Sequence, residues 1–174
     1  MSMQTFEIAG NTPGIRLMGR MDISQPQIAL DWTGSGIEFR FRGSDAWARL
    51  EAPVASPIMW MIVLADGMPI TRFPVEPGIR MYPLLLGLEA DKERTVTLMK
   101  ETQCMPDEPA ATVLLQSLRI DGELTELPAR EFKIEFIGDS LTSGEGALAA
   151  RDNMEWVTPG SPPVGTIPGM PARH

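Results

Sequence analysis

The hexapeptide IEFRFR at residues 37–42 carries the clearest periodicity in the chain. Its apolar side chains alternate strictly with charged ones, so an extended backbone sends the two kinds to opposite faces. This pattern is typical of an antiparallel sheet with one face on a core and the other in water. The stretch therefore predicts a half-buried antiparallel strand.

Short apolar or alternating runs lie on both sides of this strand. The dipeptides Ser44-Asp45, Asp66-Gly67 and Asp121-Gly122 are turn signals between them. We expect the other strands at residues 15–21, 27–32, 46–51, 58–65, 69–73, 78–86, 94–100 and 111–120. Many short strands with frequent turns and no convincing helix predict a mainly β fold, an antiparallel jelly roll or β-sandwich over residues 1–128.

The character of the sequence changes after a linker that we place at residues 129–132. The stretch KIEFIGDSLTSGEGA at residues 133–147 begins as a short apolar run typical of a buried strand. It breaks at Gly138 into small polar residues and runs on into a helix candidate. Because a parallel α/β domain opens in this way, residues 133–157 are predicted to be its first strand and helix.

Ser140 stands where the predicted strand gives way to this turn. A serine there can serve as an acyl-transfer nucleophile, because backbone N–H groups at a following helix start stabilise an oxyanion. Gly-Asp-Ser is also a common turn composition in which the polar side chains cap a helix. The strand before it and the sequence LTSGEGA after it favour the nucleophile.

Residues 138–146 resemble the first conserved block of the GDSL, or SGNH, hydrolases. The resemblance implies that Ser140 is the nucleophile and that its backbone N–H donates to the oxyanion, with Gly138, Asp139 and Leu141 supporting the motif. Thr142 stands two residues past the serine, where the elbow of the α/β-hydrolases has glycine.

The predicted β domain is similar to the jelly roll of bacterial acetyl esterases of carbohydrate esterase family two. The similar segments are Gly19-Arg20, WTGSGIEFRF at 32–41, residues 63–67 and VTLMKET at 96–102. In that family a jelly roll of this length precedes an SGNH domain, as it does here. The resemblance implies a serine esterase that removes O-acetyl groups from carbohydrate and needs no cofactor or metal.

The resemblance stops after residue 157. Residues 158–174 contain five prolines and three glycines without periodicity, so we expect them to be disordered or loosely packed. The family's histidine base and its other oxyanion donors have no counterpart, since the single histidine is His174 at the end of the chain. We therefore predict a truncated portion of an esterase that is inactive, or nearly so, alone.

The composition of the chain limits the kinds of molecule that the protein is expected to bind. The formal net charge of −8 disfavours nucleic acid and anionic membranes. No apolar run approaches the length of a spanning helix, and the start lacks the features of a signal peptide, so we expect a cytoplasmic protein. An apolar strand at residues 134–137 without sheet neighbours would be open to pairing with the sandwich or a second copy.

A second hypothesis treats the β domain as a stand-alone carbohydrate-binding or interaction module. Aromatic faces can stack on sugar rings, but tryptophans in or beside strands are mostly core or partly buried. We expect such burial of Trp32, Trp47 and Trp60. We expect Trp156 to pack locally or to be exposed. The arginines at positions 40, 42 and 49 are expected on a solvated sheet face.

Overall fold

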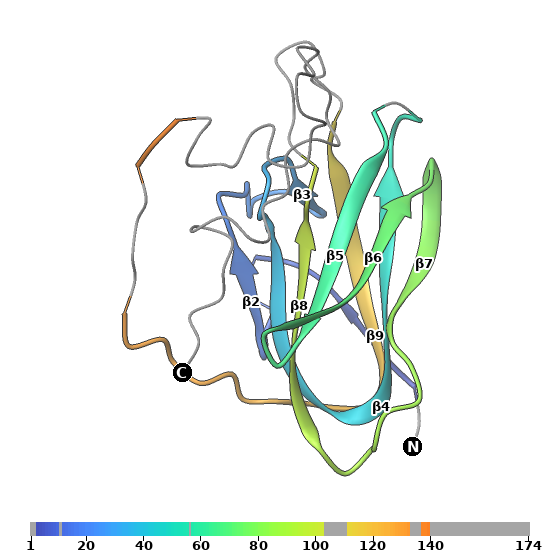
Figure 1. Ribbon diagram of the computed structural model, residues 1–174, viewed down its shortest axis with the longest axis vertical. Coiled ribbons are helices and arrows are strands. Elements are labelled where there is room, and N and C mark those ends of the chain that lie inside the picture. Colours follow the sequence, from blue (N-terminus) through green and yellow to red (C-terminus); the bar gives the residue numbers. More distant parts are fainter. Residues whose placement is uncertain (1–2, 11, 56, 103–110, 133–136, 140–174) are drawn as a thin grey trace, which may run out of the picture.

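The computed structural model describes residues 3–10, 12–55, 57–102, 111–132 and 137–139 (Figure 1). Nine β-strands and no helix lie within these residues. The strands are β1 (Gln4–Glu7), β2 (Ile15–Met18), β3 (Ile28–Leu30), β4 (Gly36–Ala52), β5 (Met59–Ala65), β6 (Met68–Val75), β7 (Gly78–Leu85), β8 (Glu93–Lys100) and β9 (Val113–Thr125). No helix in this described part is long and apolar enough to cross a membrane.

The strands pair antiparallel throughout in one sheet that folds over on itself. The front layer contains β2, the first half of β4, β8, β5 and β6. The back layer contains β7, the second half of β4, β9, β1 and β3. Figure 1 shows β4 curving along the bottom of the view from one layer to the other. The expected antiparallel sandwich is therefore confirmed.

The core lies between the two layers and includes the predicted face of the hexapeptide. Ile37, Phe39 and Phe41 are fully buried, and the two phenylalanine rings lie 5.8 Å apart. They pack with inward residues from both layers, including Val63 of β5 and Leu118 of β9. Period-two alternation thus identified the buried face of β4 correctly.

Two predicted turns are wrong, because their residues lie inside long strands. Ser44 and Asp45 belong to β4, which continues to Ala52 with a register shift between Gly43 and Ala46. Asp121 and Gly122 belong to β9 and face this irregularity. The turn-forming residues therefore build a β-bulge, which bends β4 as it passes between layers.

The Asp121 carboxylate accepts hydrogen bonds from polar groups of the bulge. Its Oδ1 accepts from the backbone N–H groups of Ser44 and Asp45, each at 2.8 Å, and its Oδ2 accepts from Ser44 Oγ at 2.6 Å. Partial burial raises the pKa of Asp121, but these hydrogen bonds outweigh burial and hold the pKa below its usual value. At Gly122 an added Cβ would lie 2.0 Å from the carbonyl oxygen of Arg42, so glycine is needed there.

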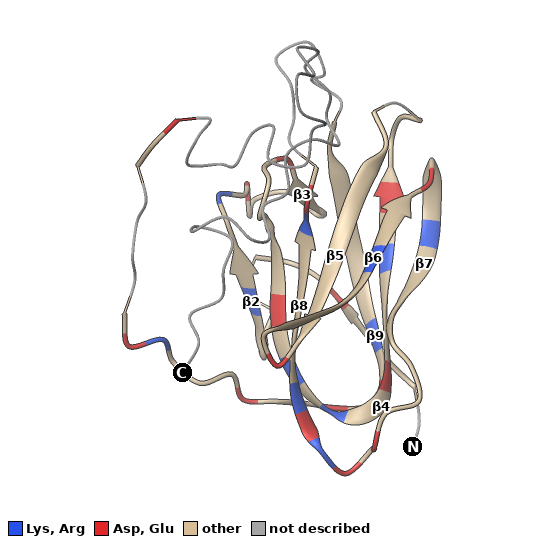
Figure 2. Cartoon of the chain, in the orientation of Figure 1, with Lys and Arg blue, Asp and Glu red and all other residues tan. Residues whose placement is uncertain are grey.

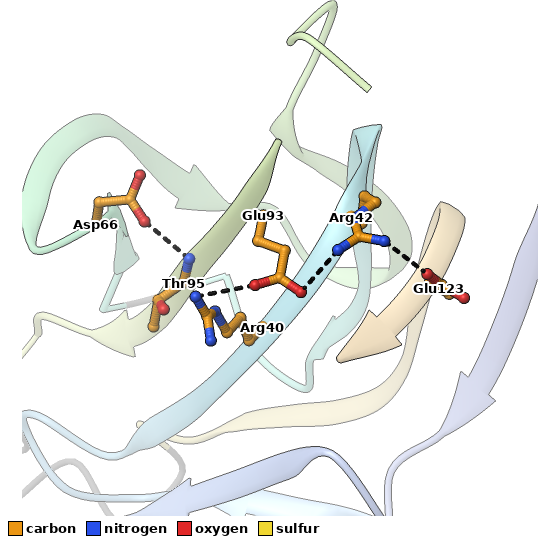
Figure 3. Close-up of polar contacts among 6 residues, drawn as sticks. All are labelled: Arg40, Arg42, Asp66, Glu93, Thr95 and Glu123. Carbon is orange, nitrogen blue, oxygen red and sulfur yellow. Dashed lines mark hydrogen bonds and ion pairs between the residues drawn. The ribbon is translucent and has the colours of Figure 1, made fainter. Parts of the chain in front are cut away.

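The predicted hairpin at Asp66-Gly67 is confirmed. Both residues have positive φ, 50° and 79°, which matches the type I′ turn that Asp-Gly favours. The Asp66 carboxylate also accepts from the backbone N–H of Thr95 at 2.9 Å, and this contact attaches the hairpin to β8 (Figure 3).

Ion pairs connect three strands on the outer face near the bulge. Glu93 of β8 pairs with Arg40 at 2.9 Å and Arg42 at 3.1 Å, and Arg42 also reaches Glu123 of β9 at 3.5 Å (Figure 3). These arginines are partly solvated, as expected, but Arg49 lies beyond the bulge on the back layer and does not join them.

Candidate functional site

The nucleophile predicted from the sequence, Ser140, lies outside the described residues, as does Leu141. Gly138 and Asp139 are described, and both are exposed and lie in no strand or helix. The catalytic role of Ser140 therefore stays a prediction. So do the strand and helix expected over residues 133–157 and the disordered tail expected over residues 158–174.

The linker that leads to this motif is held against the sandwich. Glu38 Oε2 accepts from Arg16 Nη1 at 2.6 Å and from Arg130 Nη2 at 2.7 Å. Arg16 Nη2 also donates to the carbonyl oxygen of Pro128 at 2.6 Å. We call Arg16, Glu38, Pro128 and Arg130 the linker clamp. It holds the linker beside β2 at the point where the chain leaves the sandwich (Figures 1 and 2).

The sequence predicted Glu38 as one more charge on a solvated face, and its role in the clamp was missed. Its side chain is 13% exposed and is shared by two arginines that lie far apart in the sequence. Charge-assisted hydrogen bonds of this kind are short and about twice as strong as neutral ones. A local pattern carries no signal for this contact, because its partners come from β2 and from the segment after β9.

A groove of about 770 Å³ opens beside the clamp, between the start of the chain and the end of β9. Phe6, Ile15 and Leu124 form part of its lining, together with Glu126 and Leu127, which follow β9. The groove therefore lies along the path by which the chain leaves β9 toward the linker.

A second cluster, missed by the sequence analysis, surrounds Trp60. The Arg72 guanidinium carbon lies 4.1 Å from the centroid of the Trp60 ring, within cation–π distance. The Nε of Arg72 donates to the Glu101 carboxylate, whose side chain is only 7% exposed. The backbone N–H of Trp60 donates to Thr102 Oγ1 at 2.6 Å, so β5 and the segment directly after β8 hold this cluster in place.

The tryptophans differ in exposure. Trp47 and Trp60 are half-buried, as expected, but Trp32 is 64% exposed, so the expectation of burial is wrong for it. Trp32 lies in the loop that follows the short strand β3. The Trp32 carbonyl oxygen accepts from the backbone N–H of Ser35 at 3.0 Å, and this hydrogen bond closes the loop. Because a loop outside the strand pairing has no sheet face to cover it, its indole projects into solvent. Trp156 lies outside the described residues.

Lys100 is a fully buried lysine beside the Trp32 loop. Its Nζ donates to the carbonyl oxygen of Asp31 at 2.8 Å, while its backbone pairs with Gly34 and Ser35, each at 2.8 Å. These contacts give Lys100 a structural role at the end of β8. Within the described ranges, His, Cys, Asp and Glu side chains form no group of three that could hold a metal ion.

Residues 17–129 match the model of the family described as carbohydrate esterase 2 N-terminal. The chain belongs to this family. The matched range begins in β2, contains β3 to β9 and ends at residue 129, between Pro128 and Arg130 of the linker clamp. The sandwich from β2 to β9 is therefore the part of the chain that matches the family two N-terminal domain.

Three relatives place this domain within larger proteins. A cellulase/esterase of Acetivibrio thermocellus is 33% identical over 141 residues, which are 78% of this chain and 16% of that protein. An acetyl xylan esterase from the rumen bacterium Butyrivibrio proteoclasticus superposes with a TM-score of 0.85 at 30% identity, covering 95% of this chain and 44% of that one. A family two carbohydrate esterase from Clostridium thermocellum, in complex with cellohexaose, gives 0.73 at 27% identity, covering 87% and 45%.

The chain spans less than half the length of each of these relatives. The family two domain described above therefore corresponds to one part of such an esterase. Ser140 lies past the end of the matched family range, and its role belongs to the proposal below.

Proposed function

We propose that this chain is the N-terminal portion of a serine esterase that removes O-acetyl groups from carbohydrate. The observation that carries the proposal is the likeness to the acetyl xylan esterase, with a TM-score of 0.85 over 95% of the chain at 30% identity. Membership of the carbohydrate esterase 2 N-terminal family supports it. The Gly-Asp-Ser motif adds a candidate nucleophile, Ser140, ten residues after Arg130 of the linker clamp.

In the proposed reaction, the Ser140 hydroxyl attacks the carbonyl carbon of the acetyl ester. The tetrahedral oxyanion accepts a hydrogen bond from the Ser140 backbone N–H, and the sugar oxygen leaves and takes up a proton. Water then attacks the acetyl-enzyme and releases acetate. The substrate is an acetylated carbohydrate, and no step requires a cofactor.

A serine hydroxyl needs a base to take its proton. We propose that this base and the remaining oxyanion donors come from the part of the esterase that corresponds to the other half of the matched relatives. The 174-residue chain alone is then expected to show little or no activity.

The decisive experiment uses the full-length gene product with an acetylated xylan and a chromogenic acetyl ester. We expect Ser140→Ala to lower kcat/KM by at least about 10³-fold, because removal of a nucleophile leaves only residual catalysis. Ser143→Ala, three residues further along the same motif, is the matched control and should retain activity. Equal activity in the wild type and Ser140→Ala would refute the nucleophile assignment.

The exposed Trp32 favours a second candidate, a carbohydrate-binding role for the sandwich itself. An indole face open to solvent is a platform on which a pyranose ring can stack. Isothermal titration of the full-length Ser140→Ala protein with cello- and xylo-oligosaccharides tests this role. Binding that is lost in Trp32→Ala would support it, and binding that is unchanged by that substitution would exclude Trp32 as the platform.

A further inference from the structure

Exposed apolar side chains lie on strand β7, at the edge of the back layer (Figure 1). Ile79 is 49% exposed and Met81 is 43% exposed. Both project from the outer face of this layer, because the residues opposite them on β4 alternate with core residues. A single exposed apolar residue is common on a protein, whereas neighbouring ones mark a surface that binds a partner.

Trp47 extends this apolar surface from β7 onto β4. Arg49 lies opposite Met81 in the register, and Trp47 stands two residues before Arg49 on the same face. Trp47 is therefore the diagonal neighbour of Met81, a separation that an aromatic side chain can bridge. Its own side chain is half-buried, so part of the indole is open to solvent. We call Trp47, Ile79 and Met81 the back strip.

Two exposed arginines border the back strip. Arg119 of β9 lies opposite Trp47, and Arg49 lies opposite Met81. Within the residues that the structure describes, neither arginine forms an ion pair. By contrast, the arginines of β2 and β6 and those in the first half of β4 each pair with a glutamate. The cations of the back face are therefore available to a partner.

An exposed glutamate lies on the same face. Glu7 of β1 projects outward, because the residues on either side of it pack in or against the core. Ser117 of β9 separates Glu7 from Arg49 in the register, and no ion pair of the described part of the chain includes Glu7. Tryptophan, methionine and arginine are enriched at protein interfaces, where an apolar centre has a polar rim. The back face has this composition and this arrangement.

We propose that the outer face of the back layer binds a second copy of this chain in a symmetric dimer. Each copy of a two-fold dimer contributes the same patch, so the patch must be complementary to itself. The back face meets this condition, because an arginine of each copy can pair with a glutamate of the other while the two apolar strips cover one another. The inference is independent of the proposed esterase activity.

Another exposed apolar surface lies at the edge of the front layer and provides a matched control. Ile70 of β6 is 47% exposed, which is close to the value for Met81. Ile70 and Leu86 line a groove of about 560 Å³, and the charged residue of this lining is Arg94, which already pairs with Asp66. The groove therefore lacks the unpaired charges of both signs that make the back face self-complementary.

The test is sedimentation velocity of the full-length gene product over a range of micromolar concentrations. We expect the wild type to have twice the mass of one chain. Arg119→Glu and Met81→Glu each bring a negative charge into the covered face and should weaken association at least about tenfold. Ile70→Glu is the control for Met81→Glu and should leave the dimer intact. Arg20→Glu is the control for Arg119→Glu, because Arg20 is exposed and follows β2 of the front layer.

A wild-type protein that stays monomeric over this range would overturn the proposal. A dimer that either Arg119→Glu or Met81→Glu leaves intact would also overturn it, as would a control that weakens association as much as its matched variant. Circular dichroism and the Tm confirm that each variant folds, and Arg49→Glu replaces Arg119→Glu if that protein does not fold. Acetyl-ester hydrolysis by the wild type is measured on the same preparation. Absent hydrolysis counts against the proposed function alone, whereas the mass decides the dimer.

Discussion

Replacement of Asp121 by alanine tests how the β-bulge is stabilised. The change removes three hydrogen bonds and leaves the N–H groups of Ser44 and Asp45 without their acceptor. A hydrogen bond contributes about 1 kcal/mol net, and a donor left without a partner in a partly buried site costs about as much or more. We therefore expect the free energy of unfolding to fall by about 2–4 kcal/mol.

The effect is measured by urea unfolding and by calorimetry. For a domain of this size, about 3 °C per kcal/mol converts the expected loss into a Tm decrease of about 6–12 °C. Asp22→Ala is the matched control. Asp22 also has a lowered pKa, caused first by the Ser24 hydroxyl, then by the Ser24 backbone N–H and Gln25, but it lies on an exposed loop. Its replacement should leave the Tm unchanged within error.

The pH dependence of protein stability provides a second, independent test of the role of Asp121. Because the pKa of Asp121 is lower in the folded state than in the unfolded state, its ionised form stabilises the fold above the unfolded value of about 3.9. This contribution is lost as the pH falls through the lower, folded value. The stability difference between wild type and Asp121→Ala should therefore shrink below about pH 4. An Asp121→Ala protein as stable as Asp22→Ala at neutral pH would refute the reasoning.

Two further substitutions probe contacts that the tertiary structure creates. Arg72→Ala leaves the buried Glu101 carboxylate without its cation and should lower the free energy of unfolding, measured by urea unfolding, by about 1–2 kcal/mol. Arg80→Ala is the control, because its ion pair is exposed, and it should change this free energy little. Equal effects of the two substitutions would contradict the expectation. Gly122→Ala would place a Cβ against the carbonyl oxygen of Arg42, so we expect a loss of about 3 kcal/mol or more, and a normal Tm by calorimetry would show that the strands can separate freely.

On the outer face of the front layer, the position of Glu38 follows from neighbouring residues, whereas its partners come from distant parts of the sequence. Alternation along β4 places Glu38 on that face, and this could be inferred from residues 37–42 alone. Nothing near it in the sequence indicates Arg130 or Arg16 as its partners. The clamp arises because β2 pairs with β4 while the segment after β9 passes beside them.

The sequence alone determined which residues face the core, the hairpin at Asp66-Gly67 and the candidate nucleophile motif, because periodicity and turn chemistry act over a few neighbouring residues. It could not separate a turn from a bulge at Ser44-Asp45, because the carboxylate that satisfies those amides comes from Asp121 on another strand. Only the tertiary structure decided the bulge, the position of Arg72 over Trp60 and the linker clamp. Each depends on strand register, and register brings together polar groups whose attraction is absent until the strands have paired.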